Sequence, residues 1–390
     1  MSKRPIKAAL LQVHSIVGLA ISLVLALIGV TGAMLSFEDE IIASLNAGIM
    51  QVEARSTPVL TPDVMIARLQ AGRDLGKVAS LTMSSDPSAA ARVRFARDDG
   101  GARPSSVYVD PYDGHMLGVA SGEGFFVTTR KLHRWLLLPD DGKGYGRPIT
   151  GVATLGLVVL LVSGLVLRWP RRARSVKMWL KPNLALRGRS FQWSLHSVVG
   201  TWALVVYLVM ALTGLWWSFD WYRNGATWLL SARPVAVVPM QAKSPPPPRA
   251  ADAAALSLDR AWSVFLREQG SRFATAQLMV PVGAGTVLRV RSVARDASHE
   301  GARDEFRIDA VTGRLVSSEL YADKSFGDRM LASVLDIHSG SIFGWPGQLL
   351  FMLAAALMPL FTVTGFILYL SRRKLRPAPQ PALGSLVAGE

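Results

Sequence analysis

Four long apolar runs constrain this chain more than any other feature of its sequence. They cover roughly residues 16–37, 149–169, 198–219 and 349–370, and the only charged side chain in them is Arg168. Each is long enough to cross a bilayer as a helix, which takes about 20 apolar residues. The two long polar stretches between them could each form a small domain. We therefore predict a membrane α-helical fold, with four transmembrane helices in a bundle and two α+β domains outside the lipid bilayer.

The charge distribution predicts the orientation of the chain in the membrane. The net charge is +15, and much of the positive charge falls at three places: before the first run, between the second and third, and after the fourth. Short basic segments of this kind favour the cytoplasmic side. We expect both termini in the cytoplasm and the two polar domains on the far side. This placement argues against nucleic acid as a partner.

An internal repeat relates the two halves of the chain. The first and third runs match without gaps at an offset of 182 residues, which pairs His14 with His196, Gly18 with Gly200, Thr31 with Thr213, Gly32 with Gly214 and Ser36 with Ser218. The second and fourth runs correspond more loosely, with Ser163-Gly164 in the place of Thr364-Gly365. Both halves would then run span, domain, span in the same orientation, as in a parallel duplication.

The polar domains repeat as well. Residues 107–114 and 306–313 both alternate like strands and end in a glycine turn, and each is followed by a second short strand. A helix is predicted before each hairpin, at residues 61–72, which open with Thr-Pro, and at 257–269. Residues 245–248 are four prolines that form a stiff linker into the second domain.

The predicted order along the chain follows from these features. It is transmembrane helix 1 (8–37), outer domain 1 (38–126), an interfacial helix with transmembrane helix 2 (127–170), a basic cytoplasmic loop (171–190), transmembrane helix 3 (191–220), outer domain 2 (221–328), an interfacial helix with transmembrane helix 4 (329–371) and a cytoplasmic tail (372–390).

Four of the six histidines lie beside a predicted span. His14 and His196 each follow the last cytoplasmic charge by seven residues, so the repeat places both imidazoles about 10 Å further along their helices, at matching depth. Glycines and a serine lie on the same face of each helix as the histidine. Such a stripe admits either a flat bulky group or a closely packed neighbouring helix. An ionisable group in apolar surroundings favours a functional role.

His133 and His338 form a weaker second pair near the outer face. Each lies in an apolar segment just before an inward-going span, but their registers relative to the spans differ by a few residues. Interfacial amphipathic helices would explain either histidine alone. His115 and His299 fall in polar loops, where we expect solvated surface side chains.

Two histidine pairs, one near each face, suit two non-covalent haem groups. The chain has no cysteine, which excludes thiolate-held iron–sulfur clusters and covalent C-x-x-C-H attachment. Imidazole is a common axial ligand of haem iron, and the core of a helical bundle is a common place for a cofactor. Zinc is the competing metal, although no H-E-x-x-H motif and no carboxylate near the inner pair supports it.

The motifs together resemble the PepSY-associated transmembrane helix family over about residues 8–376. They are the L-x-x-H-x-x-x-G, T-G and S-F-E-D series of the first span, D-P-Y-D-G, L-H-R-W-L-L-L and G-L-V-L-R-W-P-R-R. That family includes siderophore-utilisation reductases of the ferrioxamine-reductase type. The resemblance implies a bacterial inner-membrane protein with periplasmic PepSY-like domains. It also implies two haem b groups, with His14, His196, His133 and His338 as the ligands of the haem iron.

The function expected from this resemblance is reduction of ferric siderophores at the periplasmic face. Electrons would come from a separate donor, a quinol or a cytoplasmic reductase, because no dinucleotide fingerprint, P-loop or G-x-S-x-G motif is present. Two other classes remain open. One is a non-redox module that binds or inhibits a periplasmic peptidase, and the other is a permease for a siderophore or a metal.

Overall fold

The computed structural model describes residues 3–96, 106–139, 142–169, 174–231, 256–281 and 285–374. The predicted proline linker, Arg171, Arg172 and the tail beyond residue 374 lie outside these ranges. The chain divides into two compact units. The helical unit comprises Met1–Ala33, Lys131–Ser218 and Phe351–Glu390, and the sheet unit comprises Met34–Arg130 and Phe219–Leu350. Each unit is described by itself.

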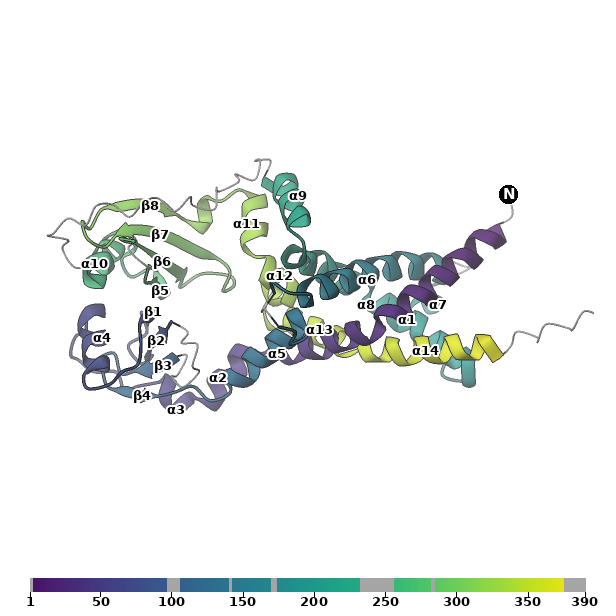
Figure 1. Ribbon diagram of the computed structural model, residues 1–390, viewed down its shortest axis with the longest axis horizontal. Helices are drawn as coiled ribbons and strands as arrows, with labels where there is room; N and C mark the ends of the chain where they lie inside the picture. Colours follow the sequence, from purple (N-terminus) through teal and green to yellow (C-terminus); the bar gives the residue numbers. More distant parts are fainter. Residues whose placement is uncertain are drawn as a thin grey trace, which may run out of the picture. The chain divides into compact units, whose positions relative to one another are not determined.

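The helical unit contains the four predicted spans (Figure 1). Its helices are α1 (Lys3–Leu35), α6 (Gly146–Arg168), α7 (Val176–Leu180), α8 (Gly188–Ser218), α13 (Gly344–Ala356) and α14 (Met358–Lys374). The helices long and apolar enough to cross a membrane are Pro5–Leu35, Gly146–Arg168, Gly188–Ser218 and Ser341–Arg372. The prediction of four membrane-spanning helices is thus confirmed.

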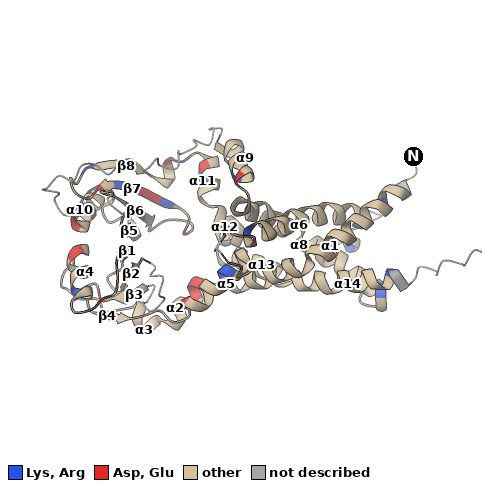
Figure 2. Cartoon of the chain, in the orientation of Figure 1, with Lys and Arg blue, Asp and Glu red and all other residues tan. Residues whose placement is uncertain are grey.

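The surface of the helical unit is apolar where lipid would cover it. The side chains of Leu23 and Val205 are 78% and 69% exposed, although both are aliphatic. Figure 2 shows the long helices almost free of charged residues between their ends. Because water would make such exposure unfavourable, the bilayer is the solvent of this unit.

The fourth span is divided into α13 and α14 at Leu357. Pro359 cannot donate a backbone hydrogen bond, which favours a break at this point. The break brings the backbone of the span against α1 at Gly29, where an added Cβ would lie 2.6 Å from the carbonyl oxygen of Ala355. Thr362 also donates a hydrogen bond to the carbonyl of Ser22 in α1. The first and fourth spans therefore pack closely along α1.

The sheet unit is a mixture of helices and antiparallel strands. Its helices are α2 (Glu38–Leu45), α3 (Ala47–Met50), α4 (Pro62–Gln70), α9 (Asp220–Ser231), α10 (Leu258–Gln269), α11 (Phe326–Ala332) and α12 (Val334–Ser339), with α5 (Glu123–Trp135) continuing into the helical unit. Its strands are β1 (Val78–Ser84), β2 (Ala91–Phe95), β3 (Ser106–Val109), β4 (Met116–Gly118), β5 (Phe273–Met279), β6 (Val287–Ala294), β7 (Arg303–Asp309) and β8 (Leu315–Glu319).

All eight strands form one antiparallel sheet in the order β4-β3-β2-β1-β5-β6-β7-β8. Each half is a four-strand meander preceded by a helix, which confirms the predicted helices and hairpins. The two hairpin turns need glycine, because Gly114 and Gly313 have φ angles of +79° and +73°. The pairing of β1 with β5 joins the two meanders edge to edge, a feature that the sequence analysis did not predict.

The apolar core of this sheet lies on one face, under α4 and α10 (Figure 1). The two helices also cap each other at their N-termini. Asp259 accepts hydrogen bonds from the Asp63 backbone N–H and the Thr61 hydroxyl, and Asp63 accepts from the backbone N–H groups of Leu258 and Asp259. Each carboxylate thereby satisfies free donors of the other helix.

Candidate functional site

The structure brings the two inner histidines together. His14 lies on α1 and His196 on α8, with their ring centroids 6.5 Å apart and their planes at 74°. The Nδ1 atom of His14 lies 2.8 Å from the Ser163 hydroxyl of α6. The Nδ1 atom of His196 lies 2.7 Å from the Thr364 hydroxyl of α14. Every span thus contributes one polar side chain to this cluster.

The hydroxyl groups determine which ring nitrogen carries the proton. Ser163 donates its single proton to the carbonyl of Val159 at 2.6 Å, and Thr364 donates to the carbonyl of Leu360 at 2.7 Å. Both hydroxyls must therefore accept from the imidazoles, which places N–H on Nδ1 of each ring. The Nε2 lone pairs of His14 and His196 remain available to a metal. A metal-bound histidine is commonly held in this way.

The spacing of the two rings fits a shared metal ion. A metal bonded to one nitrogen of each imidazole at about 2 Å would hold the ring centres about 6 Å apart. Gly164 and Gly365 lie directly beside the rings, and an added Cβ would be 3.3 Å from Cε1 of His14 and 3.8 Å from Cε1 of His196. The donors are two neutral nitrogens without a carboxylate, a set that suits a transition metal.

The third predicted ligand, His133, lies on α5 and packs against α1. Its Nδ1 atom lies 3.0 Å from the carbonyl oxygen of Ile28 and 3.0 Å from the Thr31 hydroxyl. A carbonyl can only accept, so Nδ1 of His133 also carries the proton. Burial lowers the pKa of His133 to about 4, although the hydrogen bond to Ile28 acts in the opposite direction. The imidazole is therefore neutral at neutral pH.

Gly32 explains why this approach to α1 is possible. A Cβ at Gly32 would lie 3.1 Å from Cε1 of His133, a contact too tight for most side chains. By contrast, Gly18 and Gly200 meet apolar side chains, Leu160 and Phe361, at ordinary distances of 3.7 and 3.5 Å. The predicted stripe of small residues thus admits a histidine at Gly32 and apolar side chains at the other two glycines.

The end of α5 is held in an unusual conformation just after His133. Leu136 and Leu137 have φ angles of +57° and +55°, which are costly for residues with a branched side chain. The first turn of α6 lies against this end, because Thr150 donates to the carbonyl of Arg134 and Gly146 touches the backbone of Trp135. Backbone strain of this kind is often found at functional sites.

The remaining histidines lie in the sheet unit. His338 is half-buried on α12. His115 is exposed, as predicted, and pairs with Asp113 at 2.8 Å. The prediction for His299 was wrong, because its side chain is only 4% exposed. It lies 3.3 Å from the Tyr321 hydroxyl, 3.4 Å from Ser333 Oγ and 3.5 Å from Asp336. The loop around it is polar in sequence, and only tertiary packing buries it.

Other groupings in the sheet unit are structural. Ser333, His299 and Asp336 have the residue types of a hydrolase triad, but Ser333 has no exposed surface, so a substrate cannot reach its hydroxyl. Asp110, Asp113 and His115 lie close enough to share a metal ion. However, Arg55 already pairs with both carboxylates, at 2.7 and 3.0 Å. This arrangement stabilises the turn between β3 and β4.

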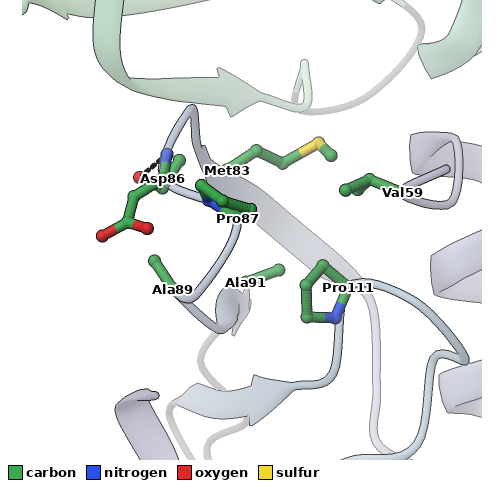
Figure 3. A pocket seen from close by; sticks show the side chains of 8 residues that line it. Val59, Met83, Asp86, Pro87, Ala89, Ala91 and Pro111 are labelled. Carbon is green, nitrogen blue, oxygen red and sulfur yellow. Dashed lines mark hydrogen bonds between the residues drawn. The ribbon is translucent and has the colours of Figure 1, made fainter. Parts of the chain in front are cut away.

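Two pockets among the described residues are alternatives to the histidine cluster. The cavity in Figure 3 is lined by Val59, Met83 and Pro111 among others, and its volume of about 10 Å³ holds at most one water molecule. In the helical unit, an open apolar groove of about 300 Å³ lies between α1 and α6, lined by residues such as Ile21 and Val152. It has no polar side chain that could orient a ligand. The histidine cluster therefore remains the candidate site.

A comparison with known protein families gives a match over most of the chain. The family described as PepSY-associated TM region matches residues 11–372, which is most of the chain. No curated protein sequence matches it. The matched region includes most of the first span, the other three spans, the strands named above and the histidines.

Proposed function

This chain belongs to the PepSY-associated TM region family, and on that premise we propose that it carries electrons across the bacterial inner membrane. The acceptor would be a ferric siderophore at the periplasmic face, whose Fe(III) gains one electron and becomes Fe(II). The donor would be a separate quinol or a cytoplasmic reductase. Hard oxygen donors hold Fe(II) less tightly than Fe(III), so reduction would release the iron.

The observation that carries this proposal is the inner histidine pair. Two imidazoles from different spans lie 6.5 Å apart, each with Nδ1 held by a hydroxyl, and they would supply the donors for haem iron within the apolar layer. Haem b held there, with a second group held by His133 and His338, would supply one-electron carriers near the two faces of the membrane. The pairing of His133 with His338 is taken from the sequence.

The residues of the chain would tune and isolate these carriers. Ser163 and Thr364 orient the inner imidazoles and increase their basicity by accepting the Nδ1 protons. Phe361 packs edge-on against His196 at 5.3 Å between ring centroids and shields it from water. A dry, apolar surrounding of this kind influences the reduction potential of a bound metal.

The proposal is tested by the visible spectrum of the protein purified from haem-replete cells. We expect reduced-minus-oxidised bands of a bis-histidine haem, with haem content reduced by His14→Leu and by His196→Leu to a similar extent. The exposed His115 serves as the matched control, and His115→Gln should leave the bands unchanged. A colourless wild-type protein would reject electron transport.

The other two functional classes predict different results. A permease would move a siderophore or metal into sealed vesicles without any reductant. A peptidase-binding module would keep its binding activity in the His14→Leu variant, because the cluster would then have only a structural role. Reductant-dependent formation of Fe(II) by reconstituted protein, lost in the same variant, distinguishes the proposed function from both.

A further inference from the structure

The face of the sheet opposite α4 and α10 carries two matching pairs of arginines. Alternate residues of β2 and β6 point away from the apolar core, and these are Arg92 and Arg94 on β2 and Arg289 and Arg291 on β6. Both strands read Arg-Val-Arg, with the valine buried in the core. The two strands occupy corresponding places in the two meanders.

The strands between these arginines present small or uncharged side chains on the same face. Strand β1 lies next to β2, and its Thr82 pairs with Arg92 and its Ser80 with Arg94. Strand β5 lies next to β6, and its Gln277 pairs with Arg291 and its Met279 with Arg289. Gln277 donates to the Ser80 hydroxyl at 3.2 Å across the central strand pair. The two arginine pairs thus flank an uncharged strip of the sheet, called the floor below. It consists of Ser80, Thr82, Gln277 and Met279.

The width of this floor follows from sheet geometry. Strands β2 and β6 are three strand spacings apart, which corresponds to about 14 Å between their backbones. Arg289 and Arg291 turn towards Glu305 on β7, and Arg92 turns towards Glu123 of α5, so the strip between β2 and β6 stays open. Its width suits a compact ligand about 10 Å across rather than a single small anion. A hexadentate iron chelate has about this size.

Glu305 on β7 fixes the orientation of the guanidinium groups at the β6 edge. Its carboxylate accepts from Arg289 at 2.7 Å, from Arg291 at 3.3 Å and from Arg307 at 3.2 Å. One carboxylate cannot neutralise three guanidinium groups, and each guanidinium has further N–H donors. The cluster is therefore preorganised and still positively charged.

Arg94 at the β2 edge is exposed, and no hydrogen bond links it to any of the residues that the structure describes. Its neighbour Arg92 pairs with Glu123 of α5. Desolvation, followed by the like charge of Arg92, lowers the pKa of Arg94. A bound anion would relieve this repulsion between Arg94 and Arg92.

We propose that this arginine-flanked face binds the ferric chelate, and that it selects negatively charged chelates over neutral ones. The inference rests on the proposed function and adds the substrate class and the place of binding. Three catecholates around Fe(III) give a complex with three negative charges, whereas three hydroxamates give a neutral one. Guanidinium groups on two edges complement the former through charge-assisted hydrogen bonds.

The test measures binding without electron transfer, by using gallium(III) in place of iron. Isothermal titration of the full-length protein in detergent compares a Ga(III) tris-catecholate with a Ga(III) tris-hydroxamate. We expect at least about tenfold tighter binding of the catecholate, weakening as salt is added. The double variant Arg94→Gln with Arg291→Gln should lose at least about tenfold in affinity.

Arg267→Gln provides the matched control, because Arg267 is an exposed arginine of α10, on the other face of the sheet. It should bind the catecholate as the wild type does. Equal binding of the neutral chelate, or unchanged affinity in the double variant, would overturn the proposal. Displacement by citrate at equal potency would also overturn it, since the face would then be a general anion site.

The two proposals fail in different ways. Gallium(III) is not reduced under these conditions, so the titration is independent of haem content and of any electron donor. A colourless protein that binds the gallium catecholate through these arginines would reject electron transport and retain the binding face. A haem protein that does not bind the chelate would reject the binding face alone.

Discussion

The imidazole rings of His14 and His196 lie with their centroids 6.5 Å apart, although 182 residues separate them in the sequence. Each ring packs on the backbone of a further span, at Gly164 and Gly365, and each is hydrogen-bonded to the hydroxyl residue just before that glycine. The cluster therefore depends on four helices at once. Its partner hydroxyls can be tested separately from the histidines.

Replacing Ser163 with alanine or Thr364 with valine should weaken haem retention. Loss of the acceptor for Nδ1–H allows the imidazole to rotate or change tautomer, and substitutions of this kind commonly cost about 10–100-fold in metal affinity. The ratio of haem to protein after detergent washing measures the effect. Ser15→Ala is the control, because the Ser15 hydroxyl donates to the carbonyl of Leu11 in its own helix. Unchanged haem content in both variants would contradict the assigned tautomers.

Gly146→Ala should destabilise the helical unit. An added Cβ would lie 2.1 Å from the carbonyl oxygen of Trp135, so α5 and α6 must separate, at a cost of about 1–3 kcal/mol. Gly124→Ala is the matched control, since a Cβ there meets nothing within 4 Å and the residue is helical. That change should be neutral or stabilising by up to about 1 kcal/mol. Melting temperatures in detergent that change equally for both variants would refute the predicted contact.

Asp63→Ala and Asp259→Ala should each lower the stability of the sheet unit by about 1–2 kcal/mol. Either change removes the acceptor for N–H groups at the start of the other helix, α10 or α4. Asparagine at the same positions should restore part of the loss, because its side-chain oxygen can also cap a helix. Thermal unfolding followed by circular dichroism reports the effect. Glu268→Ala, an exposed change on α10, should leave it unaltered.

The ion cluster around Glu305 predicts a dependence of stability on acid pH. Burial raises the pKa of Glu305, but the hydrogen bond and charge of Arg289 and its neighbours outweigh this and lower it to about 2 from 4.5. The cluster therefore stabilises the fold fully above about pH 4.5, and the contribution is lost as the pH falls towards 2. Glu305→Gln should melt at a lower temperature than the wild type at pH 7. The difference should shrink between pH 4.5 and 3, and a constant difference would argue against the assigned pKa.

His299→Ala should destabilise the fold, whereas His115→Ala should not. The side chain of His299 is 4% exposed, and its removal takes one buried polar neighbour from Tyr321, Ser333 and Asp336, which costs about 1–3 kcal/mol. The side chain of His115 is 59% exposed, and changes at such positions are usually within about 0.5 kcal/mol. Equal melting temperatures for the two variants would show that the His299 network contributes little.

The spans and hairpins could be predicted because they depend on local sequence. A run of about 20 apolar residues has few alternatives to a membrane-spanning helix, since every backbone group must be satisfied without water. Strand alternation and a glycine turn likewise identify the two hairpins, at Asp110–Gly114 and Asp309–Gly313. The break at Leu357 was missed, although Pro359 was visible in the sequence.

The site was only partly predictable. The repeat identified His14 and His196 as an equivalent pair, and it singled out Ser163-Gly164 and Thr364-Gly365 without giving them a role. Their roles as acceptors for the imidazole N–H groups required the structure, because they lie 149 and 168 residues away from their histidines. The burial of His299 was missed for the same reason: a polar loop gives no local signal of the residues that will cover it.

The sequence by itself determined the four spans, the two hairpins and the equivalence of the inner histidines, because each follows from a pattern within a segment or from a repeat of that pattern. The tertiary structure alone decided that β1 pairs with β5, that the Arg-Val-Arg strands flank one uncharged floor, and which hydroxyl each inner imidazole meets. Strand-edge pairing and helix packing depend on the summed fit of many distant side chains. No single segment of the chain contains that information.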